Sequence, residues 1–273
     1  MTASFTSVRT LVVPARFRGP THSGNGGWTA GALAAVMPAA APDGGDPAPV
    51  VEVTLRHPPP LDTRLAVEES EGLTVARFAD GQPVAEARLV DSHLDNVRAV
   101  PFEVAAAVSA AYPGHRLHPF PECFACGPAR EVGDGLRIFA GRVPGEDALV
   151  AAPWTPHRST ADPSLPPRGE GADGPPTPRA SLPVTWAALD CVSAWTSDLE
   201  HRPLVLGRMT AQVDSLPVVG EEHVVVGRRI EEAGRRTFTA STLYDARGRA
   251  IARATQVWFE VDPADFGAPG RPA

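Results

Sequence analysis

Short runs in which apolar and polar residues alternate recur along the chain, which is the pattern of half-buried β-strands. Two stretches depart from it, because residues 28–37 and 182–198 are dense in Ala, Leu, Val and Trp. We expect both to form helices, the first stopped by Pro38 and the second N-capped by Ser181. Strands are expected at 8–13, 50–57, 64–70, 73–79 and 83–90, and again at 135–143, 148–152, 205–214, 222–230, 236–245 and 250–261.

The order of strand, helix and four-strand meander therefore occurs twice. Aligning Ser23 with Ser181 also aligns Trp28 with Trp186. Such a repeat indicates internal duplication, because a sheet wrapped on one helix leaves an edge and a face that a second copy can cover. We predict an α+β fold of two antiparallel sheets, each wrapped around one long helix. The alternative is a pair of unrelated α+β domains.

This repeat sets the expected domain boundaries. We expect the first repeat at 1–95 and a connector at 96–120. The second repeat is expected at 121–263, followed by a disordered tail at 264–273. A short helix is expected at 102–111, within the connector. Residues 157–180 are rich in Pro and Gly, so we expect a mobile loop inside the second repeat.

The composition narrows the classes of function. The 273 residues carry a net charge of −7, which argues against nucleic acid as a partner. There is no apolar run near the ~20 residues that span a bilayer, and no secretory signal is visible at the N-terminus. Three cysteines are too few for a disulfide scaffold. We expect a cytoplasmic protein with no nucleic acid and no membrane as partner.

Three motifs resemble the hotdog thioesterase superfamily. Residues 19–35, GPTHSGNGGWTAGALAA, resemble the helix entry of acyl-CoA thioesterases. Residues 123–128, CFACGP, and 135–138, GLRI, are similar to the start of small phenylacetate-pathway-type thioesterases. Residues 186–191, WAALDC, are similar to the helix that carries the acidic residue in many of these enzymes. The resemblance implies a double hotdog fold, a CoA or carrier-protein thioester as substrate, and frequent thioester hydrolysis. We expect no cofactor.

Asp190 is the strongest candidate for a catalytic residue. It lies in the apolar run of a helix that should be buried. Burial of a carboxylate is costly without partners, and it raises the pKa toward the range of a general base or nucleophile. The alternative is a surface carboxylate that faces solvent or pairs with Arg. The first repeat has Ala32 at the equivalent position, so we expect one catalytic site per chain.

Asn25, Gly26 and Gly27 are candidates for binding the thioester carbonyl. Glycines at a helix start leave N–H groups open to an oxygen, and the helix dipole adds positive potential. The alternative is a tight turn that needs glycine for its conformation. The second repeat has Pro-Val-Thr at 183–185, where small hotdog thioesterases usually carry His-Gly-Gly. One resolution is that the first repeat supplies the glycines and the second supplies the acid.

Gln256, Thr210 and His22 complete the candidates. Residues 252–258, ARATQVW, are similar to the last strand of acyl-CoA thioesterase II, where a Gln and a Thr join an Asp to orient water. This resemblance implies the same roles for Gln256 and, with less fitting spacing, for Thr210. Both also fit outward polar positions of alternating strands. His22 either contacts the substrate, forms a dehydratase-like dyad with Asp190, or lies on the surface.

The cysteines offer a further candidate site. Cys123 and Cys126 form one Cys-x-x-Cys, and His115 and His118 lie nearby. Zinc needs about four ligands, but this spacing is not that of known zinc fingers. We therefore expect no metal, and interpret Cys123 and Cys126 as small residues before a strand and Cys191 as a buried thiol.

Three functions fit these observations. The first is an acyl-CoA or acyl-carrier thioesterase. The second is a non-catalytic module that binds acyl groups or small molecules, favoured by the missing His-Gly-Gly. The third is a dehydratase or hydratase acting on an acyl thioester through His22. The sequence leaves open the acyl chain, the carrier, the pathway and any further pairing into a homodimer.

Overall fold

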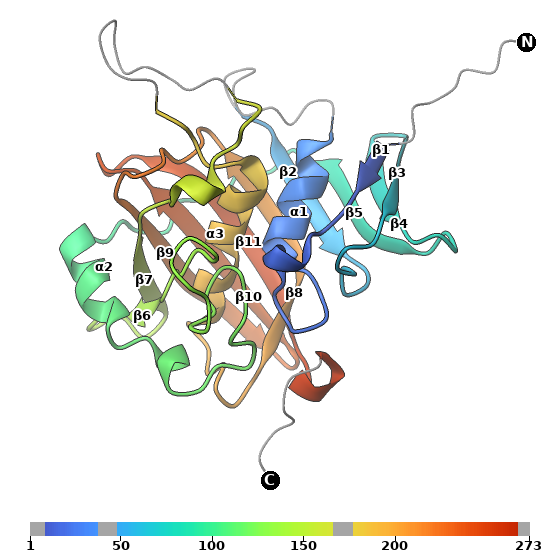
Figure 1. Ribbon diagram of the computed structural model, residues 1–273. Helices are drawn as coiled ribbons and strands as arrows, with labels where there is room; N and C mark the ends of the chain where they lie inside the picture. Colours follow the sequence, from blue (N-terminus) through green and yellow to red (C-terminus); the bar gives the residue numbers. More distant parts are fainter. Residues whose placement is uncertain (1–8, 38–47, 166–176, 267–273) are drawn as a thin grey trace, which may run out of the picture.

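The computed structural model describes residues 9–37, 48–165 and 177–266 (Figure 1). Val8 of the first expected strand, residues 166–176 of the expected 157–180 loop, and the tail from 267 lie outside the described residues. The described part of that loop contains a 3-10 helix, Arg158–Thr160, and the bridge Ala161↔Ala180. Among the described residues, every helix is too short or too polar to cross a membrane.

Strands are the main regular elements of the molecule. The first half contributes β1 (Arg9–Leu11), β2 (Val50–Leu55), β3 (Leu65–Ser70), β4 (Leu73–Arg77) and β5 (Pro83–Leu89). The second half contributes β6 (Gly141–Arg142), β7 (Leu149–Trp154), β8 (Leu204–Val213), β9 (His223–Ala233), β10 (Arg236–Tyr244) and β11 (Ala250–Glu260). The strand expected at 135–143 is reduced to β6. Arg137 has a φ of +56°, which breaks the extended chain before it.

All described strands belong to one antiparallel sheet with the order β1-β3-β4-β5-β2-β8-β11-β10-β9-β7-β6. The prediction of two separate sheets is therefore wrong, whereas the α+β class is confirmed. β2 pairs with β8, from Val50↔Gln212 to Thr54↔Arg208. Without this pairing both strands would be edges with unpaired N–H and C=O groups, so joining the halves satisfies them. The order β1-β3-β4-β5-β2 in the first half matches β7-β9-β10-β11-β8 in the second.

Two helices lie side by side on one face of the sheet (Figure 1). They are α1 (Gly26–Ala35) and α3 (Leu182–Ala194), and nearly all their residues are buried. α1 contacts β2, β5 and β8, while α3 contacts β9, β10 and β11. Glycine permits their close approach, since a Cβ on Gly31 would lie 2.7 Å from Trp186 Cβ. This helix pair places the N-terminus of α1 beside the middle of α3.

The connector between the halves contains α2 (Phe102–Ser109), which packs against β7. The chain then forms a tight turn at 120–127, in which Cys123 N–H donates to Phe120 O and Gly127 N–H donates to Cys123 O. Leu136 and Ile138 donate backbone hydrogen bonds to Phe124 and Ala125 of this turn. Residues 135–138 are thus tied to the turn, which lies against the cavity described next.

Candidate active site

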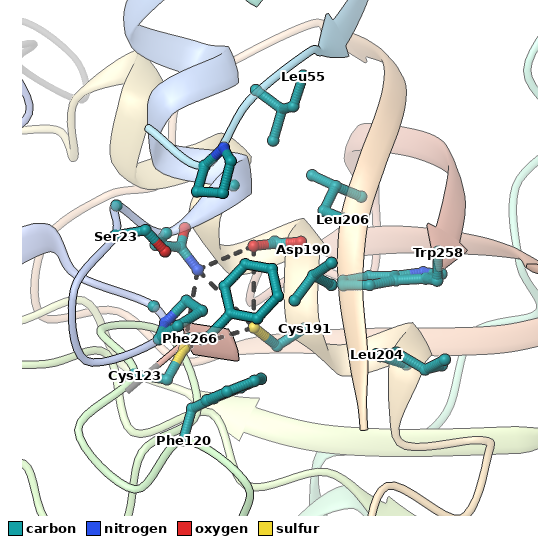
Figure 2. Close-up of a pocket in the computed structure, with 18 of the residues that line it drawn as sticks. Ser23, Leu55, Phe120, Cys123, Asp190, Cys191, Leu204, Leu206, Trp258 and Phe266 are labelled. Atoms are coloured by element: carbon teal, nitrogen blue, oxygen red, sulfur yellow. Dashed lines mark hydrogen bonds between the residues drawn. The ribbon is translucent and has the colours of Figure 1, made fainter. Parts of the chain in front are cut away.

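A cavity of about 250 Å³ lies where the N-terminus of α1 meets α3. Figure 2 shows its lining residues, which are mostly apolar. They include Leu55, Phe120, Leu204, Leu206, Trp258 and Phe266. Among its polar lining residues, Asn25 at the helix start lies against Asp190 and Cys191 of α3. An apolar cavity with a few convergent polar groups is the usual form of a small-molecule site.

The Asp190 carboxylate is buried, with 2% of the residue exposed. Its Oδ2 accepts hydrogen bonds from Asn25 Nδ2 at 2.8 Å and from Gly27 N at 2.9 Å. Its Oδ1 has no hydrogen-bond partner among the described residues. One oxygen therefore fixes the orientation of the carboxylate, and the other keeps its acceptor capacity for a water or a substrate atom.

Burial has a direct electrostatic effect on this group. Loss of water raises the pKa of Asp190 to about 7, because the charged form is disfavoured in an apolar surrounding. The hydrogen bonds from Gly27 N–H and from Asn25 act in the opposite direction and limit the rise. A carboxyl with a pKa near neutrality can accept a proton in one step and release it in the next.

The start of α1 is built to hold this carboxylate. Asn25 is the N-cap, and its Oδ1 accepts from Trp28 N at 2.8 Å, so its Nδ2 is directed to Asp190. Gly27 lies so close to α3 that a Cβ there would be 2.5 Å from Asp190 Cβ. Gly26 N–H makes no hydrogen bond to another described residue, and Gly26 lines the cavity. The structure thus brings the Asn-Gly-Gly turn and the acid of the other half together.

Gln256 lies outside the cavity. Its side chain is buried among α3 and neighbouring strands, where Oε1 accepts from Ser193 and Thr239 and Nε2 donates to Leu189 O and Ser241. It does not line the cavity, and its hydrogen bonds do not include the Asp190 carboxylate. Gln256 thus lies on the face of the sheet toward α3, where its hydrogen bonds hold the helix.

Thr210 and His22 are also away from the cavity. Thr210 pairs with Glu52 and Thr255 in the sheet, whereas its neighbour Met209 is fully buried on the helix side. Because side chains alternate between faces, Thr210 points to the face opposite the helices. His22 is exposed and does not line the cavity. The structure therefore does not bring either residue to Asp190.

One group beside the cavity was missed from the sequence. The sulfurs of Cys123, Cys126 and Cys191 lie within 4.8 Å of one another. Cys191 Sγ is also 3.8 Å from Asp190 Oδ2, so the thiols adjoin the carboxylate. The Cys-x-x-Cys spacing was visible, but the approach of Cys191 depends on how the 120–127 turn packs on α3.

Comparison with known proteins supports the fold. No protein-family model matches the sequence, and no curated protein matches it. A conserved hotdog-fold protein of unknown function from Alicyclobacillus acidocaldarius is similar in structure, with a TM-score of 0.57, 14% identity, and coverage of 94% of this chain and 95% of that one. The tesB protein of Mycobacterium avium subs paratuberculosis is similar with a TM-score of 0.51, 11% identity and 89% coverage of both chains. At these identities the likeness is one of fold, and it confirms the predicted hotdog fold.

Proposed function

We propose that this protein hydrolyses an acyl thioester, with CoA or a carrier protein as the thiol, and that Asp190 is its catalytic residue. The observation that carries the proposal is the buried Asp190 carboxylate, held through Oδ2 in an apolar cavity with Oδ1 unpaired. A water-excluding apolar wall strengthens the electrostatic interactions of such a group. The motifs at 19–35 and 186–191 that resemble hotdog thioesterases contain these residues.

The reaction follows from this arrangement. The acyl group enters the cavity, and its carbonyl oxygen accepts a hydrogen bond from Gly26 N–H at the positive end of α1. Asp190 Oδ1 takes a proton from a water molecule, whose oxygen attacks the carbonyl carbon. The tetrahedral intermediate collapses with cleavage of the C–S bond, and Asp190 returns the proton to the leaving thiolate. General-base catalysis of this kind contributes about 10²–10⁴-fold.

The fold fits one such site per chain. The second half supplies the acid, Asp190, and the first half supplies the helix start, Asn25, Gly26 and Gly27. One site therefore needs both halves. The equal strand order of the halves supports an origin by duplication, with repeats at 1–95 and 121–263. A dehydratase acting through His22 gains no support, because His22 is exposed outside the cavity.

A panel of acyl-CoA thioesters, read by release of free thiol, tests the proposal. We expect turnover of at least one substrate, and a fall in kcat of about 10²–10⁴-fold in Asp190→Asn. Asp198→Asn is the matched control, since Asp198 is an exposed carboxylate just beyond α3. Saturable binding without turnover across the panel would instead indicate a binding module. Unchanged turnover in Asp190→Asn would remove Asp190 from the mechanism.

A further inference from the structure

All three cysteines of the chain meet at one point. Cys123 and Cys126 lie on the 120–127 turn, and Cys191 lies on α3. Cys123 and Cys126 are buried, Cys191 is partly buried, and all three line the cavity. Two elements that are distant in the sequence thus direct every thiol of the protein into one cluster.

The spacing of the sulfurs fits a tetrahedral metal ion. Zinc binds thiolate sulfur at about 2.3 Å, which separates two sulfurs on a tetrahedral ion by about 3.8 Å. Cys123 Sγ and Cys191 Sγ are 3.6 Å apart, and all three sulfurs lie within 4.8 Å of one another. A disulfide would need about 2.05 Å. The three sulfurs therefore surround one position at which a soft cation would contact each of them after a small contraction.

A fourth ligand lies beside the cluster. His118 Nε2 is 3.3 Å from Cys126 Sγ, close to the separation of a nitrogen and a sulfur on one zinc ion. His118 Nδ1 accepts a hydrogen bond from Phe120 N–H, which places the ring proton on Nε2. Coordination through Nε2 thus requires the proton to move to Nδ1 and the contact with Phe120 to open.

The surroundings favour negatively charged sulfur. Asn25 Nδ2 donates one N–H to Asp190 and also lies 3.7 Å from Cys123 Sγ and 3.8 Å from Cys191 Sγ, so its second N–H is shared between these sulfurs. Three buried thiolates need a cation to balance their charge.

We propose that Cys123, Cys126 and Cys191 bind one Zn²⁺ ion, with His118 as the fourth ligand. A closed set of four protein ligands is typical of structural zinc. The ion ties the 120–127 turn to α3 one residue from Asp190, and so fixes the wall of the cavity. The site is independent of the proposed hydrolysis, because it is defined by metal content and not by turnover.

The test is metal analysis of the full-length protein, purified under reducing conditions. We expect one equivalent of zinc by elemental analysis. After replacement by Co²⁺ we expect a thiolate-to-cobalt charge-transfer band and the visible bands of tetrahedral cobalt. Cys126→Ser and Cys191→Ser should weaken metal binding by at least about 100-fold, more than the loss of an outer-shell contact. His115→Asn is the matched control, because His115 is an exposed histidine of the same segment.

Reduced wild-type protein with no zinc and no cobalt band would overturn the proposal, as would undiminished metal binding in the cysteine variants. If a variant fails to fold, the wild-type cobalt spectrum decides the question alone. A fall in Tm of the wild type on addition of a chelator is the second readout, since a metal that binds the folded state stabilises it.

Discussion

Replacement of Asp190 by Asn should stabilise the folded protein while it lowers turnover. The pKa of Asp190 rises from 3.8 to about 7 on folding, chiefly through burial. A carboxyl whose pKa is higher in the folded state contributes stability below its unfolded pKa, and this is lost as the pH rises through the folded value. At about 1.4 kcal/mol per tenfold change, the ionised group destabilises the fold by up to about 4 kcal/mol at pH 8.

The amide removes this penalty because it carries no charge. Its oxygen can still accept from Asn25 Nδ2 and Gly27 N, so the anchoring at the start of α1 is kept. Its NH₂ group then occupies the position of Oδ1, which has no partner among the described residues, and this reduces the gain. We expect Asp190→Asn to be more stable than the wild type by about 2–4 kcal/mol at pH 8.

Urea denaturation at pH 5 and pH 8 measures the effect. The advantage of the variant should grow by about 2–3 kcal/mol between these two pH values, since the wild-type group ionises over this range. Asp198→Asn, which changes an exposed carboxylate, should show no comparable growth. An advantage that is absent, or equal at both pH values, would refute the assignment of a buried carboxyl with a raised pKa.

Three further substitutions separate the roles of the candidate residues. Gln256→Ala removes the four buried hydrogen bonds of this side chain and should lower stability by about 1–3 kcal/mol or more in urea denaturation; unchanged stability would contradict the network. Thr210 lies on the face of the sheet opposite the helices, so kcat of Thr210→Val should stay within about threefold of the wild type. A large loss of kcat would place Thr210 in the active site. Gly27→Ala forces a Cβ to 2.5 Å from Asp190 Cβ. The free energy of unfolding should fall by about 1–3 kcal/mol, and Tm and kcat should fall with it.

The sequence predicts the helices and Asp190 well because burial leaves a strong local signal. An apolar run such as 186–191 has no polar face, so its single carboxylate must be enclosed. The Asn-Gly-Gly turn was also a sound candidate, since its glycines mark a close approach at a helix start. Local pattern therefore predicted the burial of Asp190 and the helix start at 25–27, although it left open whether they meet.

Long-range pairing explains what the sequence could not predict. The alternation in β2 and β8 shows that each has a buried face, but it does not show that their edges join into one sheet. Similarly, Thr210 and Gln256 are both polar strand residues, and the β8–β11 register decides which one faces α3. The cysteine cluster depends on the packing of an irregular turn, for which no periodic signal exists.

The pH dependence of catalysis tests the central claim most directly. kcat/KM for an acyl-CoA substrate should be measured beside the ionisation of the Asp190 carboxyl, followed by ¹³C NMR. Because the base must be ionised to accept a proton, activity should rise with pH and both curves should share a midpoint near 7. A rate that is independent of pH between 5 and 9, or a carboxyl that titrates near 4, would contradict the account.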